Sequence, residues 1–105
     1  MDQAAVRQHA QAHGQAVVDN DLNKAGGDLT GDVLTYVADI MKQLPRPVTA
    51  AEVVDVAEDG DAYTAQIRYS GDDKTVNVRS RWQDVEGRPR IVELKVMSDQ
   101  RGDLA

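Results

Sequence analysis

Two histidines, His9 and His13, stand four residues apart near the start of the chain. On a helix this spacing places both imidazoles on one face, where they could share a metal ion. No glutamate adjoins His9 in the pattern of the zinc peptidases, no third ligand is evident, and the chain has no cysteine. We therefore predict no metal site. We expect His13, which belongs to an apolar helix stripe, to be a partly buried, hydrogen-bonded residue.

A second group of residues faces the interior of the sheet that the C-terminal half of the chain predicts. Glu52 and Tyr69 are expected at one end of this face, and Tyr63 and Trp82 toward the other. A carboxylate, phenols and an indole that face a helix-covered cavity could line a site for a small apolar molecule. The complete predicted pocket consists of His13, Tyr36, Glu52, Tyr63, Tyr69, Ser80 and Trp82.

These residues also have a purely structural interpretation. Tyr63 and Trp82 would be core aromatics whose polar ends reach the rim, and Glu52 would meet water at the start of its strand. No acid, base and nucleophile stand at a workable spacing, so the sequence predicts a non-enzymatic binding or interaction module without a cofactor. The alternative is a small isomerase- or dehydratase-like enzyme in which Glu52 or His13 is the base and a tyrosine donates a hydrogen bond.

The opposite face of the predicted sheet carries charged and amide side chains of mixed sign. A solvated sheet face needs no function. Its arginine content also suits the pairing of two copies about a two-fold axis, and a chain of 105 residues without phenylalanine builds only a modest core. We therefore expect a homodimer through this face, formed by Gln66, Arg68, Asn77, Arg79, Arg81, Glu93 and Lys95.

A first helix positions His13. Helical periodicity over residues 3–20 gives an apolar stripe of Val6, Ala10, His13 and Val17. The Asp-Asn-Asp run at residues 19–21 predicts a break or a new helical turn, and two glycines at residues 26–27 end this segment.

A second, stronger helix is expected after the N-cap Thr30 and ends at Pro45, which cannot continue a helix. Tyr36 widens its apolar stripe. The stripe itself has full core-facing spacing and consists of Val33, Val37, Ile40, Met41 and Leu44.

Three turn signals divide residues 48–97 into four strands: Asp59-Gly60, the Ser-Gly-Asp-Asp run at residues 70–73, and Glu86-Gly87. Connections this short require an antiparallel meander. The register that keeps apolar residues on one face pairs Val56 with Tyr63, Ile67 with Val76, Trp82 with Val92 and Ser80 with Leu94. It produces one apolar row across all four strands: Val54, Ala65, Val78 and Val96.

The predicted fold class is α+β, with two or three N-terminal helical segments packed on the meander. The run AVVDNDLNKAGGDL at residues 16–29, the helix after it and the proline-linked first strand resemble the nuclear transport factor 2-like (SnoaL-like) superfamily, in a shortened cystatin-like variant. The resemblance implies a cone-shaped fold over about residues 5–97 and dimerisation through the sheet. In members with a pocket, it implies proton transfer by an Asp or His with a Tyr. The hairpin and third helix that the family usually inserts between its first strands have no room in this chain.

Charge and composition exclude several classes of function. The net charge of −6 would repel phosphate backbones, so we expect no nucleic-acid partner. No apolar run approaches the roughly 18 residues that a membrane span needs, and the N-terminus has no apolar signal core. The absence of cysteine fits a reducing compartment. We therefore expect a cytoplasmic protein with a single domain over residues 1–97 and a disordered tail over residues 98–105.

Overall fold

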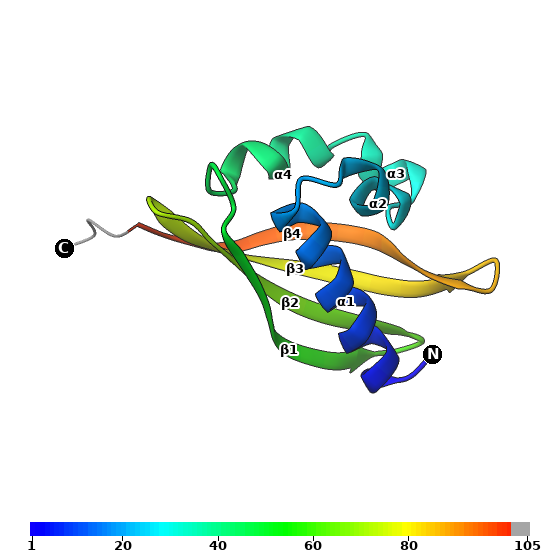
Figure 1. Cartoon of the computed structure of the whole chain (residues 1–105). Helices are drawn as coiled ribbons and strands as arrows, with labels where there is room; N and C mark the ends of the chain where they lie inside the picture. Colours follow the sequence, from blue (N-terminus) through cyan, green and yellow to red (C-terminus); the bar gives the residue numbers. More distant parts are fainter. Residues whose placement is uncertain (102–105) are drawn as a thin grey trace.

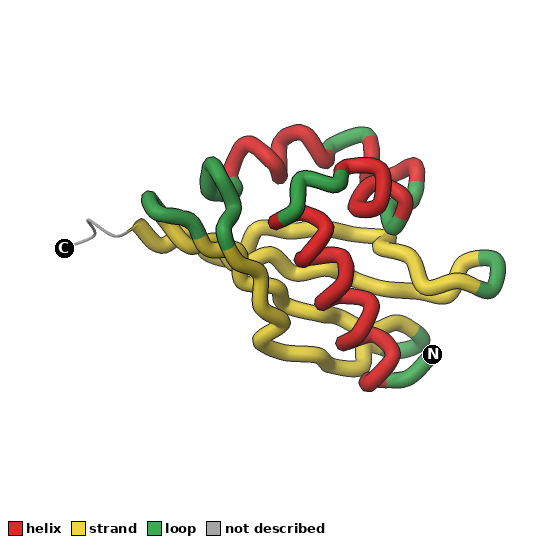
Figure 2. Tube along the Cα trace, in the orientation of Figure 1, coloured by secondary structure: helices red, strands yellow, loops and turns green. Residues whose placement is uncertain are grey.

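The computed structural model describes residues 1–101, with residues 98–101 as backbone only. Within these residues, helices lie on one face of a four-stranded antiparallel sheet (Figures 1 and 2). The helices are α1 (Gln3–Val18), α2 (Leu22–Gly27), α3 (Gly31–Leu34) and α4 (Val37–Gln43); the strands are β1 (Ala50–Asp59), β2 (Ala62–Ser70), β3 (Lys74–Val85) and β4 (Arg88–Arg101). The predicted α+β class is confirmed. None of the described helices is both long and apolar enough to cross a membrane.

Helix α1 crosses the sheet and approaches it closely. Asp2 caps it, because its carboxylate accepts a hydrogen bond from the Ala5 amide at 2.8 Å. Gly14 is buried in the C-terminal half of the helix, and a Cβ atom there would lie 2.9 Å from the Cβ atom of Ala51 on β1. The glycine therefore permits a close approach that a larger residue would obstruct.

The second predicted helix is interrupted. Thr30 precedes it as expected, but the chain forms two short helices, α3 and α4, separated by Thr35 and Tyr36. The Thr35 hydroxyl donates to the carbonyl oxygen of Asp32 at 2.6 Å, and such local bonds compete with helix continuation. Tyr36 is also held from outside the helix, because its hydroxyl accepts a hydrogen bond from the Leu94 amide at 2.9 Å. Tertiary contacts thus override the continuous apolar stripe.

The sheet is a simple meander in the order β1-β2-β3-β4, as predicted. The third hairpin keeps the predicted pairs of Ser80 with Leu94 and of Val78 with Val96. The first hairpin is shifted by two residues, because Gly60 (φ +65°) begins its two-residue turn rather than ending it. A two-residue shift preserves the face to which each side chain points. Val56 therefore pairs with Ala65, and an equal shift in the second hairpin pairs Ile67 with Val78. In the third hairpin an irregularity between Arg81 and Trp82 pairs Trp82 with Ile91 and not with the predicted Val92, so that Ile91 is the buried residue.

An irregularity in β1 reverses which side chains face the core near the start of that strand. The register shifts between Val53 and Asp55, so Val54 is an extra residue and the alternation reverses on its N-terminal side. Val53 is buried opposite Ile67, whereas Glu52 is exposed opposite Arg68. The expectation that Glu52 faces the core is therefore wrong. The predicted apolar row of Val54, Ala65, Val78 and Val96 is also wrong, because Ala65 and Val78 belong to two different rows: Val56, Ala65, Ser80 and Leu94, and Val53, Ile67, Val78 and Val96.

Polar side chains of α1 cover the free edge of β1. Three of them, spaced four residues apart, lie along one side of the helix and point at the carbonyl oxygens of the strand. The Nε2 atom of Gln3, an Nη atom of Arg7 and the Nε2 atom of Gln11 donate to Val56, Val53 and Ala51 at 3.1, 3.3 and 3.3 Å. An edge strand whose backbone acceptors are occupied is a poor template for pairing with another chain.

The opposite edge of the sheet is anchored by the segment between α2 and α3. Leu29 forms a parallel bridge with Ile91 of β4. The Ile91 amide donates to the Asp28 carbonyl oxygen at 2.7 Å, and the Thr30 amide donates to the Ile91 carbonyl oxygen at 3.1 Å. These bonds fix the position of Asp28 against the sheet.

Strand β4 continues beyond the domain boundary expected from the sequence. It extends to Arg101, which pairs with Lys74 at the start of β3. Residues 98–101 are therefore part of the sheet and not of a tail. The rest of the predicted tail, residues 102–105, lies outside the described residues.

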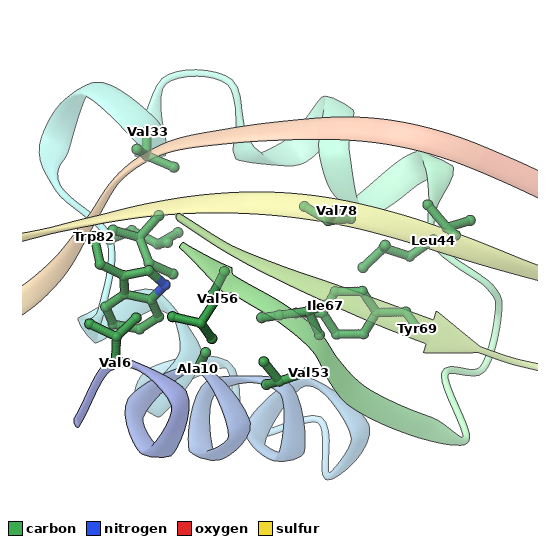
Figure 3. Close-up of a cluster of buried hydrophobic side chains, with 14 residues drawn as sticks. Val6, Ala10, Val33, Leu44, Val53, Val56, Ile67, Tyr69, Val78 and Trp82 are labelled. Carbon is green, nitrogen blue, oxygen red and sulfur yellow. The ribbon is translucent and has the colours of Figure 1, made fainter. Parts of the chain in front are cut away.

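The core fills the space between α1 and the inner face of the sheet. Figure 3 shows Trp82 beside Val6 at one end of this core, Ile67 near its middle, and Leu44 and Tyr69 at the other end. Trp82 is completely inaccessible to solvent. The end that contains Leu44 and Tyr69 is the one that leaves room for a cavity.

Candidate functional site

A cavity of about 230 Å³ lies between α1, α2 and α4 on one side and the inner face of the sheet on the other. Aliphatic side chains make most of its wall, and the exposed side chains of Leu22, Leu34 and Met41 stand at its rim. Only two of the described residues that line it, His13 and Tyr69, carry a polar side chain. A cavity of roughly 150 Å³ suffices to bind benzene, so this one can hold the apolar part of a small molecule.

His13 is held in one orientation by a carboxylate. Its Nδ1 atom lies 3.0 Å from the Oδ2 atom of Asp28, and both residues are buried. Because a carboxylate only accepts, Nδ1 carries the proton of this bond, and a neutral ring then has its lone pair on Nε2. The Nε2 atom makes no hydrogen bond to any described residue. The expectation of a buried, hydrogen-bonded His13 is confirmed.

Asp28 is itself fixed by two further contacts. Its Oδ1 atom accepts a hydrogen bond at 3.0 Å from Arg88, whose side chain is about half exposed. Its backbone is bonded to Ile91. The result is a chain of three charged or titratable side chains that ends at the cavity wall, in the order Arg88, Asp28, His13. Neither Asp28 nor Arg88 was predicted from the sequence. They lie 15 and 60 residues from their partners, and no local pattern marks them.

Tyr69 supplies the second polar group of the cavity. Its side chain is buried, and its hydroxyl makes no hydrogen bond to any of the described residues. Burial disfavours the phenolate and raises the pKa of Tyr69 well above its ordinary value. The hydroxyl therefore stays protonated at neutral pH and can donate a hydrogen bond to a ligand.

Ser80 and Trp82 lie in the core and not at the cavity. The indole N–H of Trp82 donates to the Ser80 hydroxyl at 2.9 Å, and that hydroxyl donates to the Ala65 carbonyl oxygen at 2.8 Å. The rings of Trp82 and His13 pack edge to face, with their centroids 6.2 Å apart. The polar groups of these two predicted pocket residues are therefore hydrogen-bonded to each other, and Trp82 packs against the His13 ring.

The remaining predicted pocket residues lie elsewhere. Glu52 is exposed on the far face of the sheet, Tyr63 is half-buried opposite Trp82, and the Tyr36 hydroxyl is bonded to β4. His9 is exposed, with its ring centroid 6.3 Å from that of Trp82. Among the residues that the structure describes, no group of three or more His, Cys, Asp or Glu could hold a metal ion. The structure thus brings only His13 and Tyr69 of the predicted set together at the cavity.

A second, larger hollow of about 480 Å³ adjoins the cavity. The turn after α1 and the segment that joins α4 to β1 form its outer wall. The two spaces share four wall residues, Val17, Leu22, Met41 and Leu44. Arg46 is the one charged residue among those that line the second hollow.

The predicted dimer residues lie together on the face of the sheet that no described helix covers. The register forms rows across the strands, such as Asp55, Gln66, Arg79 and Lys95. Arg81 is opposite Glu93 as predicted, and the ion pairs on this face include Arg79 with Glu93 at 3.8 Å and Arg81 with Asp59 at 3.6 Å. The full predicted set on this face is Gln66, Arg68, Asn77, Arg79, Arg81, Glu93 and Lys95.

Comparison of the chain with protein families, with curated proteins and with solved structures finds no match. The resemblance to the nuclear transport factor 2-like superfamily therefore stays a prediction, and function has to be argued from the site itself.

Proposed function

We propose that this protein is a binding module, of nuclear transport factor 2-like type, for a small and mostly apolar molecule held between helices and sheet. The observation that carries the proposal is an apolar cavity of about 230 Å³ with two polar groups, His13 and Tyr69, in its wall. Few convergent polar groups in an apolar pocket are typical of small-molecule sites, because the apolar wall supplies affinity and the polar groups fix orientation.

A matched pair of glycine variants tests this proposal. Gly26 lines the cavity and adjacent Gly27 does not, and a Cβ atom at either position would meet no atom within 4 Å. Gly26→Leu is therefore expected to fill the cavity without a clash, and Gly27→Leu to leave it open. Binding would be measured as the fluorescence increase of the neutral dye N-phenyl-1-naphthylamine, followed by displacement with a panel of metabolites. Equal dye binding by both variants would contradict the proposal.

A second candidate function, proton transfer, is favoured by the contact of Asp28 with His13. A histidine whose Nδ1 is held by a carboxylate presents Nε2 as a general base. With a ketone in the cavity, Nε2 would remove a proton from the carbon beside the carbonyl, while the Tyr69 hydroxyl would donate a hydrogen bond to the carbonyl oxygen. With an unsaturated ketone, return of the proton to a different carbon of the conjugated enolate would complete an isomerisation.

Deuterium exchange tests the second candidate. The protein is expected to accelerate the exchange of the α-protons of cyclohexanone in D₂O, observed by NMR. His13→Gln should abolish the acceleration, and Glu52→Gln should retain it because Glu52 is exposed on the other face. Acceleration that survives in His13→Gln would exclude His13 as the base.

We also propose that two copies associate through the uncovered sheet face. Acidic residues lie on this face of β1 (Glu52, Asp55, Asp59), whereas β3 and β4 carry three basic residues (Arg79, Arg81, Lys95) and one acidic residue, Glu93. A two-fold axis parallel to the strands would place β1 of one copy over β4 of the other, so that opposite charges meet twice.

Light scattering after gel filtration tests this association. We expect a dimer at tens of micromolar protein, and we expect Arg79→Glu to produce a monomer. Lys42→Glu is the matched control, because it makes the same change of charge on the exposed surface of α4. A monomeric wild-type protein at this concentration would rule the association out.

A further inference from the structure

The cavity and the hollow beside it share four wall residues, and together they extend from an apolar interior to a positive charge. The inner cavity is lined by aliphatic side chains together with His13 and Tyr69. The outer hollow is bounded by Val48 and by the Pro45–Pro47 segment, which includes Arg46. The four shared wall residues include Leu22 and Met41, whose side chains are 53% and 44% exposed. Long, unhindered side chains of this kind can rotate aside at little cost, so one ligand can occupy both spaces.

Arg46 has no carboxylate partner within ion-pair distance among the described residues. The acidic residues that flank Asn20, which also lines the hollow, are engaged elsewhere. Asp19 accepts a hydrogen bond from the Gln15 side chain at 3.0 Å, and Asp21 accepts one from the Lys24 amide at 3.3 Å. The guanidinium is therefore available to an anion that enters the hollow.

We propose that the ligand is an amphipathic carboxylate: a short alkyl or aryl body fills the inner cavity, and the carboxylate reaches Arg46 in the outer hollow. This inference rests on the proposed binding function and specifies its ligand class. A guanidinium matches the planar geometry of a carboxylate and can donate two parallel hydrogen bonds to it. The inner volume limits the apolar body to a short chain or a single ring.

The test compares octanoate with 1-octanol, which has the same chain without the charge. Both affinities would be measured by calorimetry on the full chain at low ionic strength. We expect octanoate to bind roughly two- to fivefold more tightly, as fits an ion pair in a partly exposed site. The preference should decrease in 0.5 M salt because the charges are then screened.

Two arginine variants locate the charge. Arg46→Gln should remove the preference for octanoate and leave the affinity for octanol unchanged. Arg68→Gln is the matched control, because Arg68 is an exposed arginine on the opposite face of the sheet; it should keep the preference. If Arg46→Gln retains the preference, or if wild-type protein binds octanol as tightly as octanoate, the inference is overturned.

The outcomes also separate this inference from the function on which it rests. Octanol binding that Gly26→Leu blocks, without any preference for octanoate, would leave the binding function intact and remove the anion site. If neither compound binds and the dye does not bind either, both the binding function and the anion site are contradicted. Binding to vesicles of anionic phosphatidylglycerol in the absence of measurable octanoate affinity would assign the anion preference to lipid surfaces and overturn the proposal of a carboxylate ligand.

Discussion

The Nδ1 atom of His13 and the Oδ2 atom of Asp28 lie 3.0 Å apart in a part of the molecule that solvent scarcely reaches. This contact joins α1 to the residue that ends α2, and the bond from Arg88 extends it to the β3–β4 hairpin. Three segments that are distant in the sequence thus meet at one carboxylate. Removal of that carboxylate is expected to affect both the stability of the fold and the orientation of the cavity's histidine.

Asp28→Ala should lower the free energy of unfolding by roughly 1–3 kcal/mol, because it leaves a buried hydrogen-bond donor on His13 without its partner. Urea denaturation would measure the change. Arg88→Gln is the comparison: the Arg88 side chain is about half exposed, so its loss should cost under about 1 kcal/mol. An Asp28→Ala variant as stable as the wild type would show that the contact contributes nothing to folding.

Gly14→Ala should destabilise the protein although alanine favours helices by about 1 kcal/mol over glycine. The new methyl group would lie 2.9 Å from the Cβ atom of Ala51 and 3.4 Å from a methyl of Ile67, and overpacking of this kind costs roughly 1–3 kcal/mol. Thermal and urea denaturation would measure the net effect.

The control for this prediction is Gly27→Ala, at a helical position with open space around the new atom. It should be neutral or stabilising by up to about 1 kcal/mol. Ala51→Gly, introduced into the Gly14→Ala variant, should restore part of the lost stability because it removes the atom with which the methyl group clashes. Additive effects of the two changes would mean that they do not meet.

Ser80→Ala should cost roughly 1–3 kcal/mol, because the buried indole N–H of Trp82 then has no acceptor. Trp82 is the sole tryptophan of the chain, so its fluorescence reports directly on this site and its emission should shift. Ser70→Ala, at a partly buried serine of β2, should change neither stability nor emission appreciably. Equal effects of the two variants would contradict the role assigned to Ser80.

The burial of Tyr69 predicts a loss of stability at high pH. Burial raises the pKa of Tyr69 in the folded protein, whereas the unfolded chain has an ordinary value near 10. Above about pH 10 the unfolded state therefore releases a proton that the folded state retains, and the free energy of unfolding falls by up to about 1.4 kcal/mol per pH unit. Below pH 9 this contribution is constant.

Tyr69→Phe should reduce that slope between pH 10 and 11, as determined from urea denaturation at a series of pH values. At pH 7 the same variant should be nearly as stable as the wild type, because the hydroxyl makes no hydrogen bond to a described residue. An unchanged slope in Tyr69→Phe would show that other groups cause the alkaline loss of stability.

Local patterns predicted the elements of this fold well. The order of helices and strands, the meander and the polar face all follow from periodicity and turn residues. The errors occur where a local pattern does not determine geometry. Whether Gly60 begins or ends a turn shifts the register by two residues without moving a side chain to the other face.

A bulge has larger consequences than such a shift. The extra residue at Val54 exchanges the faces of all residues before it in β1, and it moved Glu52 from the core to the surface. The candidate site was predicted only in part for a related reason. His13 and Tyr69 lie on apolar stripes that periodicity reveals, whereas Asp28 and Arg88 reach the site through contacts that depend on the complete fold.

The side chains of Gln3, Arg7 and Gln11 that occupy the carbonyl oxygens of β1 have a consequence for assembly into fibrils. Growth of a fibril from this strand requires free backbone acceptors, and three of those on its edge are occupied by side chains of α1 while the helix lies on the sheet. The rate of such growth would then depend on how often the helix detaches, an event that also uncovers the core beneath it. Because three polar side chains of α1 cover this edge, the rate at which the protein aggregates should depend on how firmly its first helix is attached to the sheet.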